Sequence, residues 1–256
     1  MTEMAKTTES ESKPHRYEKN QNFNAITRFL HGRRFRYLER IVRDLSPRYG
    51  PKLRVLDIGC GPCQSFALLN GWRDDIDYTG VELRRDFVDL ATRRYGAEPN
   101  FRVHCASIAD KLDLVDKVDL ILALETFEHV PEPIVVRAAE AIGRSQFQKL
   151  FVTVPNEVGP ALAIKNVGSF LMRYNRHRQY TWKETFYASI YELDKVRLHH
   201  TAHTGFDWRW LAQTLRQNVR ITRKYTSPFQ FVPRAISPTI GFLCESRPMR
   251  QVRKAG

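Results

Sequence analysis

Apolar and polar residues are distributed along the chain in a pattern that predicts short buried strands separated by helices. Residues 53–58 (LRVLDI), 118–124 (VDLILAL) and 150–154 (LFVTV) are short apolar runs, typical of strands that are covered on both faces of a parallel sheet. Residues 78–81 and 101–104 fit two further strands. The stretches between the runs show helical spacing of apolar residues, which predicts helices at 62–70, 86–95 and 133–143.

Strands that alternate with helices in this way predict a sheet with helices on both faces. The pattern breaks after Pro155 and resumes with a helix at 206–217 and strand candidates at 219–225 and 239–244. Helical spacing also precedes the first strand, over residues 22–46. We therefore predict an α/β fold with a Rossmann-like, doubly wound, seven-stranded, mostly parallel sheet, with N-terminal helices and an insertion after the fifth strand that forms a substrate lid.

These patterns divide the chain into six segments. The first residues are polar and charged and contain few large apolar side chains, which is typical of disorder. The expected segments are a disordered tail (1–20), an N-terminal helical cap (21–50), the Rossmann-like core (51–155), a basic and aromatic lid insertion (156–205), the last helix and two strands of the core (206–245) and a basic tail (246–256).

The insertion follows the carboxyl end of a strand, which is where open α/β sheets bind ligands. It is rich in aromatic residues, namely Phe170, Tyr174, Tyr180, Trp182, Phe186, Tyr187 and Tyr191. These rings would cover an apolar or ring-bearing substrate, or they would form the core of the insertion itself. We take Tyr180 and Trp182 as candidate substrate residues. Asn156 is a third candidate because it comes just past a strand, although a plain strand-ending turn explains it equally well.

A glycine-rich turn, V-L-D-I-G-C-G-P-C at residues 55–63, carries the strongest functional signal in the sequence. Gly59 and Gly61 allow a ligand to approach the backbone closely, and the helix that follows offers its positive end. A dinucleotide fingerprint would have a third glycine at position 64, where this chain has Gln64. Asp57 precedes the turn and Glu82 ends the next strand, where an acid suits the two hydroxyls of a ribose.

Four cysteines are present, at positions 60, 63, 105 and 244. Their number and spacing predict neither a disulfide framework nor a zinc site. Cys60 and Cys63 form a C-x-x-C pair, which is a redox motif in other contexts. Because the pair falls within the glycine turn, we interpret it as part of that turn.

The turn and its acidic partner resemble the class I S-adenosylmethionine (SAM)-dependent methyltransferases over about residues 53–155, and more loosely over 206–245. The resemblance implies that SAM is the cofactor and that the turn contacts its methionine moiety while Glu82 holds its ribose. The family often has an acid near the adenine after the third strand, where this chain offers Ser107. The implied cofactor-binding residues are Asp57, Gly59, Cys60, Gly61, Glu82, Ser107 and Glu125.

A second cluster, A-L-E-T-F-E-H, ends the fourth predicted strand and contains Glu125, Glu128 and His129. Such groups can position a cofactor, deprotonate a hydroxyl or bind a divalent cation. The E-x-x-E-H segment resembles that of the ubiquinone-biosynthesis O-methyltransferases and of the small-RNA 3′-terminal 2′-O-methyltransferases. In the RNA group these residues and a later His hold a metal, which implies His203 here, although its spacing to Phe206 is one residue longer.

The candidate catalytic residues are therefore Glu128, His129 and His203. The candidate ligands for Mg²⁺ or another divalent cation are Glu125, Glu128, His129 and His203. Related enzymes without a metal also carry this segment, so a carboxylate–imidazole cluster that acts without metal is the alternative.

Charge is unevenly distributed in this chain of net charge +13. Residues 57–164 hold 11 Lys and Arg against 17 Asp and Glu, whereas residues 165–225 hold 12 against 4. Such segregation favours an anionic partner such as a phosphate, a nucleic acid or a membrane surface, although an ordinary solvated surface is an equally good interpretation.

Three functions follow from these features. The first is O-methylation of a small or lipid-linked metabolite, anionic in character; the second is RNA methylation, assisted by a metal. The third is a non-catalytic scaffold at a membrane surface, suggested by the basic amphipathic segment at residues 31–43 (HGRRFRYLERIVR). We expect a cytoplasmic protein, with peripheral membrane contact as an option, because no secretory signal and no apolar run of about 18 residues is present. The oligomeric state is not predicted.

Overall fold

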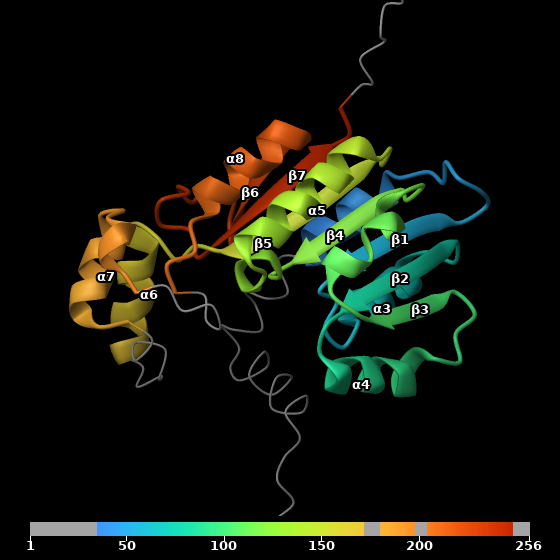
Figure 1. Cartoon of the computed structure of the whole chain (residues 1–256), viewed down its shortest axis with the longest axis horizontal. Helices are drawn as coiled ribbons and strands as arrows, with labels where there is room; N and C mark the ends of the chain where they lie inside the picture. The colour runs from blue at the N-terminus through green and yellow to red at the C-terminus, as the bar shows by residue number, and fades with distance from the viewer. Residues whose placement is uncertain (1–34, 172–179, 198–203, 248–256) are drawn as a thin grey trace, which may run out of the picture.

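A computed structural model of the chain describes residues 35–171, 180–197 and 204–247. Its centre is a seven-stranded sheet in the order β3-β2-β1-β4-β5-β7-β6 (Figure 1). The strands are β1 (Leu53–Ile58), β2 (Ile76–Glu82), β3 (Phe101–Cys105), β4 (Leu120–Leu124), β5 (Lys149–Pro155), β6 (Arg220–Ser227) and β7 (Thr239–Glu245). Strands β1 to β5 are parallel, and β7 runs antiparallel between β5 and β6. The predicted Rossmann-like, seven-stranded, mostly parallel sheet is confirmed.

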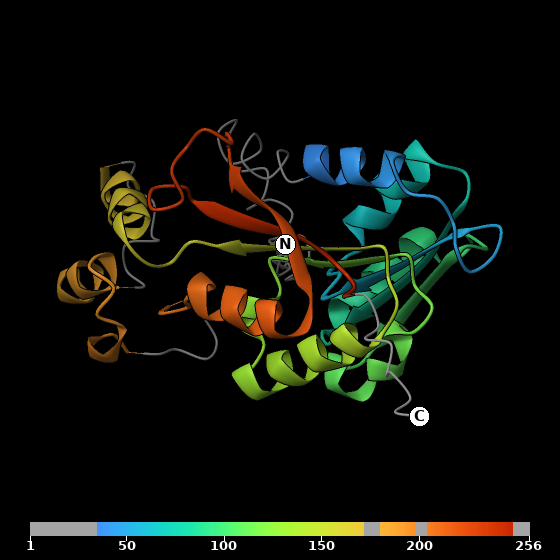
Figure 2. The ribbon, with the colours of Figure 1, turned by 90° about the horizontal axis from the view of Figure 1, so that it is seen from above.

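Helices cover both faces of the sheet. They are α3 (Gln64–Trp72), α4 (Arg85–Tyr95), α5 (Glu132–Arg144), α6 (Pro160–Leu171), α7 (Trp182–Ser189) and α8 (Trp208–Asn218), together with helical residues 35–43. Helices α5 and α8 lie on one face, and α3 and residues 35–43 lie on the other (Figure 2). The sheet is therefore doubly wound, as its near-continuous apolar strands predict.

The two-residue period of β1 sets the direction of its side chains. Leu56 and Ile58 are buried in the layer that contains α5, whereas Val55 is buried in the layer that contains α3. Burial of each such side chain contributes about 1.5–3 kcal/mol to folding. By the same alternation Asp57 faces α3, where Ser65 donates a hydrogen bond to its carboxylate. The strand thus places the carboxylate of Asp57 on the α3 side of the sheet.

The helix at residues 35–43 uses its apolar side in the protein core. Leu38 and Val42 are completely buried, and the ring of Tyr37 lies 4.6 Å from that of Tyr225 in β6. The proposal that residues 31–43 bind a membrane surface through this apolar side is therefore wrong for residues 35–43, because the apolar residues already pack on the sheet. Residues 31–34 lie outside the described part of the chain.

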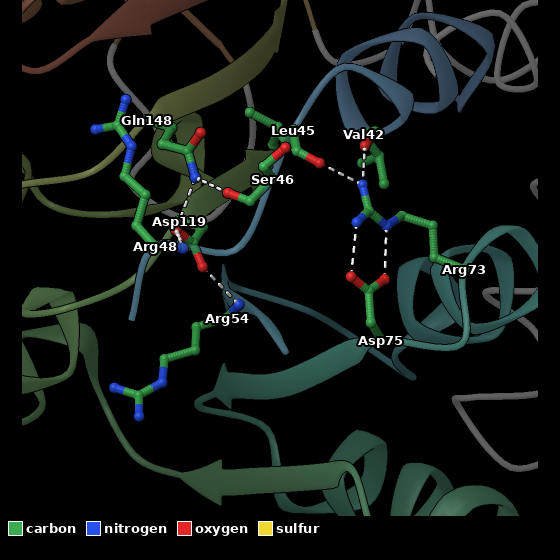
Figure 3. Close-up of polar contacts among 9 residues, drawn as sticks. All are labelled: Val42, Leu45, Ser46, Arg48, Arg54, Arg73, Asp75, Asp119 and Gln148. Carbon is green, nitrogen blue, oxygen red and sulfur yellow. Dashed lines mark hydrogen bonds and ion pairs between the residues drawn. The ribbon is translucent and has the colours of Figure 1, made fainter. Parts of the chain in front are cut away.

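A polar network holds the amino ends of the strands together (Figure 3). Asp119 is completely buried before β4, and its carboxylate accepts hydrogen bonds from the backbone N–H groups of Arg48 (3.1 Å) and Arg54 (3.0 Å) and from Nε2 of Gln148 (2.7 Å). The three donors come from different parts of the chain, because Arg48 precedes β1, Arg54 lies in β1 and Gln148 precedes β5. The network fixes the edge of the sheet that lies opposite the carboxyl ends of the parallel strands.

A second set of polar contacts, made by Arg73, lies beside the Asp119 network. Both Asp75 oxygens accept hydrogen bonds of 2.7 Å from the Arg73 guanidinium, which also donates to the carbonyls of Val42 (2.8 Å) and Leu45 (2.5 Å) (Figure 3). Those carbonyls lie at the end of the N-terminal helix, where backbone acceptors have no partner within the helix. The Arg73 side chain therefore ties the helix end to the loop between α3 and β2.

The segment between β5 and α8 is partly helical. It contributes α6, α7 and the 3₁₀ turn Leu193–Lys195. In both views α6 and α7 stand beyond the sheet, at the end where β5 leaves it (Figures 1 and 2). The described residues include no helix that is long and apolar enough to cross a membrane.

Candidate functional site

A cavity of about 620 Å³ opens at the carboxyl ends of β1, β2 and β4. The strand order reverses between β1 and β4, and such a switch point is where doubly wound sheets bind ligands. The residues that matter most for its chemistry are Asp57, Gly59, Cys60, Gly61, Ser65, Glu82, Leu83, Arg84, Ser107, Glu125, Thr126 and His129. Its volume lies within the range of roughly 300–1,000 Å³ that is typical of small-molecule sites.

The two glycines of the turn have backbone conformations that other residues rarely adopt. Gly59 has φ +67° and Gly61 has φ +54°. At Gly59 space is also limiting, because a Cβ atom there would lie 2.3 Å from Cγ2 of Thr126. The Thr126 hydroxyl donates a 3.0 Å hydrogen bond to the carbonyl of Ile58, so its side chain is held against the turn. The backbone of the turn consequently forms part of the cavity wall.

Asp57 contributes a buried carboxylate beneath the turn. Its Oδ2 accepts a hydrogen bond from Ser65 Oγ and another, 2.8 Å long, from the Tyr78 hydroxyl. Burial raises the pKa of Tyr78 well above its usual value, and the negative charge of Asp57 raises it further, so Tyr78 keeps its proton and remains a donor. The carboxylate is thereby held in a fixed orientation at the cavity.

Glu82, at the end of β2, links the turn to the next loop. One carboxylate oxygen accepts a 2.9 Å hydrogen bond from the N–H of Gly61, and the other accepts a 2.8 Å bond from the N–H of Arg84. A carboxylate has about four acceptor positions, so two such bonds leave capacity for hydroxyl donors of a ligand. Ser107 also lies at the cavity, where its hydroxyl accepts a 3.2 Å bond from the N–H of Ala109.

Comparison with known proteins agrees with this geometry. Residues 55–145 match the family model of a methyltransferase domain. Over these residues the chain contains a methyltransferase domain. No curated protein matches the sequence.

Solved methyltransferase structures share the fold. The methyltransferase domain of bacterial CtHen1-C is 15% identical, with a TM-score of 0.58, and the match covers 86% of this chain and 100% of that one. A SAM-dependent methyltransferase from Clostridium acetobutylicum is 12% identical, with a TM-score of 0.58, and the match covers 91% and 97%. The small RNA methyltransferase HEN1 is 16% identical, with a TM-score of 0.54, and the match covers 85% of this chain and 26% of HEN1. At these identities the likeness concerns the fold.

The residues of the cavity fit SAM, the cofactor of this family. SAM carries a positive sulfonium and an amino group, and the carboxylates of Asp57, Glu82 and Glu125 lie on the cavity wall. Among the described lining residues Arg84 is the single Lys or Arg, and Asp86 neutralises its charge. The chemistry of the wall is therefore suited to a cationic ligand with hydroxyl groups.

The strand-4 cluster does not converge on one point. Glu125 and His129 both line the cavity, whereas Glu128 is buried and is not part of the wall. The reason is local, because Phe127–His129 form a 3₁₀ turn in which successive side chains point about 120° apart. The sequence analysis grouped Glu128 with Glu125 and His129 because the three are close in the chain. The 3₁₀ turn, however, leaves Glu128 outside the cavity wall.

Two features single out Glu125 and His129. Glu125 has φ +56°, which is uncommon for a residue other than glycine and is found at functional sites. Its N–H donates a 2.8 Å hydrogen bond to the carbonyl of Thr153 in β5, which holds this conformation. Partial burial of His129 lowers the pKa of its imidazole below the usual 6.5, so the ring is uncharged at neutral pH.

The predicted metal site is not assembled by the described residues. In that part of the chain, no three His, Cys, Asp or Glu side chains come close enough together to hold a metal ion. The fourth predicted ligand, His203, which is also a predicted catalytic residue, lies outside the described residues. Of the predicted ligands, Glu125 and His129 share the cavity while Glu128 does not.

The predicted substrate residues do not line the cavity. Asn156 is completely buried, and its Nδ2 donates to the carbonyls of Arg234 (2.9 Å) and Ser237 (3.0 Å). Tyr180 is buried within the insertion, where its hydroxyl accepts a 2.9 Å bond from the N–H of Gly205. Trp182 is 58% exposed on α7. Asn156 and Tyr180 have structural roles because their polar groups are needed to satisfy buried backbone atoms.

The sequence interpretation missed three residues that line the cavity, Ser65, Leu83 and Thr126, and one, Tyr78, that holds a residue of its wall. Ser65 and Tyr78 hold the Asp57 carboxylate, and Thr126 packs against Gly59. Leu83 follows Glu82 directly, and its position after a strand-ending acid is a signal that could have identified it. Nothing in the local sequence identifies Thr126, because its contact with Gly59 joins two different strands.

Cys60 and Cys63 are free thiols whose sulfur atoms lie 3.3 Å apart. Burial, followed by the contact with Cys63, raises the pKa of the Cys60 thiol well above its usual value of 9.0. A reactive cysteine needs a lowered pKa, because the thiolate is the nucleophile. The electrostatics thus favour the interpretation of this pair as part of the turn.

Proposed function

We propose that this methyltransferase transfers the methyl group of SAM to an oxygen atom of a small or lipid-linked metabolite. The observation that carries the proposal is the position of His129 on the wall of the cavity, which Glu125 also lines, where burial lowers the pKa of the imidazole. A hydroxyl acceptor is a weak acid, so its methylation benefits from a base that is unprotonated at neutral pH.

We assign different parts of SAM and of the reaction to different residues of the cavity. We assign the methionine moiety to the backbone of Gly59 to Gly61 and to Asp57, the ribose to Glu82, and an adenine hydrogen bond to Ser107. When bound, SAM supplies an activated methyl group on a sulfonium, so the protein has to align the acceptor and remove its proton. We assign proton removal to His129 and the orientation of the reacting groups to Glu125.

The composition of the cavity favours an apolar or ring-bearing acceptor over a polyanion. Phe35, Leu83, Val130 and Ile134 contribute apolar surface to it. A polyphosphate substrate needs Lys and Arg side chains near its backbone, yet Arg84 is the one such residue among the described lining residues, and it pairs with Asp86.

RNA is the second candidate substrate, and a different surface favours it. Lys224 on the edge strand β6 lies near Arg216 and Arg234; burial lowers its pKa, and these two positive charges lower it further. Basic residues so arranged attract a phosphate backbone. A Lys on an edge strand also hinders pairing with a second sheet, which is a structural reason for the presence of Lys224.

One experiment separates the two substrates. Radiolabelled SAM is incubated with cell extract and the full chain, with Mg²⁺ and with a chelator, and the labelled material is fractionated. We expect label in solvent-extractable or small molecules, equal under both conditions. Glu82→Ala is the control, because it removes a predicted ribose contact and should abolish labelling.

Label in nuclease-sensitive material that disappears with chelator would replace the metabolite proposal by the RNA proposal and its metal. Full labelling by His129→Gln would refute the role of His129 while leaving the methyltransferase assignment intact. The absence of any labelled product from a chain that binds SAM would contradict both substrate proposals.

A further inference from the structure

A second cavity, of about 460 Å³, opens at the edge of the sheet where the parallel strands begin, opposite the cofactor cavity. Three parts of the chain meet there: the loop before β1, the start of β5, and the paired start of β6 and end of β7. We call it the amino-edge cavity. It shares no lining residue with the cofactor cavity. Its charged lining residues are Asp44, Arg48, Lys149, Arg220, Glu245 and Arg247.

Positive charge exceeds negative charge in the amino-edge cavity. Both oxygens of Glu245 are already bound, since one accepts a hydrogen bond from Nζ of Lys149 and the other accepts one from the guanidinium of Arg220. The bond from Lys149, followed by that from Arg220, lowers the pKa of Glu245, so its carboxylate is ionised at neutral pH. Asp44, the second acid, is exposed, and water screens its charge. One carboxylate shared by two cations leaves an excess of positive charge.

Arg48 and Arg247 contribute two further guanidinium groups, which form no ion pair in the part of the chain that the structure describes. The Arg247 guanidinium donates to the carbonyl of Arg216 in α8, which holds it in place. The backbone N–H of Arg48 binds Asp119, whereas its side chain extends away from that carboxylate (Figure 3). A guanidinium presents its donors in a planar fork that matches the oxygens of a phosphate. Two of them at one cavity suit a ligand with several acceptor oxygens.

The neutral part of the amino-edge cavity offers room for an organic group. Leu45 and Phe147 are buried and contribute apolar surface. Ser246 adds a hydroxyl, which can donate one hydrogen bond. The volume of the cavity falls within the range of roughly 300–1,000 Å³ that is typical of small-molecule sites. A phosphate together with the small group that carries it therefore fits.

We propose that the amino-edge cavity binds the phosphate group of a small phosphate monoester. Such a group carries a charge of about −1.5 to −2 at pH 7 and three acceptor oxygens, which match the excess positive charge and the forked donors of Arg48 and Arg247. A phosphodiester is a poorer ligand, because it carries a single charge. The bound ligand joins the loop before β1 to β5 and to the edge strands, so it stabilises the folded chain. The site does not depend on the proposed function, because none of its residues lines the cofactor cavity.

Thermal unfolding and titration calorimetry of the full chain test the proposal, with glycerol 3-phosphate as the ligand. We expect the Tm to rise by about 2–5 °C when the ligand is about tenfold above its Kd, and to stay unchanged with glycerol. Arg48→Gln should raise the Kd about tenfold, since it removes a charged donor of the ligand. Arg93→Gln is the matched control, because Arg93 is an exposed arginine on α4 and its loss changes the net charge equally.

Unchanged affinity of Arg48→Gln for SAM shows that this variant is folded. An equal rise of Tm with glycerol 3-phosphate and with KCl at the same ionic strength would overturn the proposal, because the effect would then be general screening. Equal Kd values of wild type and Arg48→Gln would also overturn it. Tighter binding of an oligonucleotide without terminal phosphates, weakened by Arg48→Gln, would assign the cavity to a nucleic-acid backbone instead. None of these outcomes bears on methyl transfer, which the labelling experiment tests separately.

Discussion

Substitution of Gly59 by alanine tests whether the glycine turn is constrained by backbone conformation, by space, or by both. The backbone of Gly59 has φ +67°, and an alanine there costs about 1–2 kcal/mol in the left-handed region. The new Cβ would also lie 2.3 Å from Cγ2 and 2.6 Å from Oγ1 of Thr126. Overpacking of this kind costs about 1–3 kcal/mol. We therefore expect Gly59→Ala to lower the free energy of unfolding by roughly 2–5 kcal/mol.

Gly61 provides the matched control. Its φ of +54° carries a similar conformational cost, but a Cβ atom there would have no neighbour within 4 Å. Gly61→Ala should thus lower the free energy of unfolding by only about 1–2 kcal/mol. Urea unfolding measures both, and titration calorimetry with SAM measures the effect on the cavity, where Gly59→Ala should weaken binding more.

A double-mutant cycle isolates the steric contribution. Thr126→Ala removes the two atoms that the new Cβ would meet, at a cost of about 1 kcal/mol for its hydrogen bond to the carbonyl of Ile58. The double variant Gly59→Ala/Thr126→Ala should therefore be less destabilised than the sum of the single variants, by about 1–3 kcal/mol. Strict additivity, or equal destabilisation by Gly59→Ala and Gly61→Ala, would refute the packing argument.

Three further predictions concern titration and burial. Because the pKa of His129 is lowered, its uncharged form persists below pH 6.5, so activity should fall on acidification only below that pH, and His129→Gln should lack this acidic limb in a pH–rate profile. Asp119→Ala should destabilise the fold by about 2–4 kcal/mol in urea unfolding, since the part-buried N–H groups of Arg48 and Arg54 lose their acceptor and Gln148 loses one of its two, whereas the exposed Asp116→Ala should change it by less than about 0.5 kcal/mol. Cys60 should be alkylated by iodoacetamide more slowly than free cysteine at pH 8, as measured by mass spectrometry; faster alkylation would contradict its raised pKa.

The sequence by itself determined most of the architecture. The apolar runs predicted the first strand with its observed bounds, Leu53–Ile58, and the other strands to within a few residues. Strands buried on both faces need continuous apolar sequence, and helices need a 3.6-residue period, so these elements are local properties of the chain. The glycine turn and Glu82 were also found locally, because φ above zero favours glycine and because the strand ends are visible in the pattern.

The composition of the site was less predictable. The cavity brings together Asp57, Glu82, Glu125 and His129, which come from three strand ends, as the parallel order of the sheet predicts. Glu128 was misplaced because a 3₁₀ turn separates neighbouring side chains, and sequence distance carries no information on that turn. Ser65, Tyr78 and Thr126 could not be found, because each acts through a contact between different elements.

Tertiary structure also decided which apolar surfaces are covered. Residues 35–43 and the helices of the insertion both carry apolar side chains at helical spacing, and either could have been the exposed face. Packing against the sheet buries Leu38 and Val42 of the first, whereas Phe170 and Phe186 of the second remain exposed. An amphipathic pattern shows that one side of a helix is apolar. Which part of the protein covers that side depends on the arrangement of the whole chain.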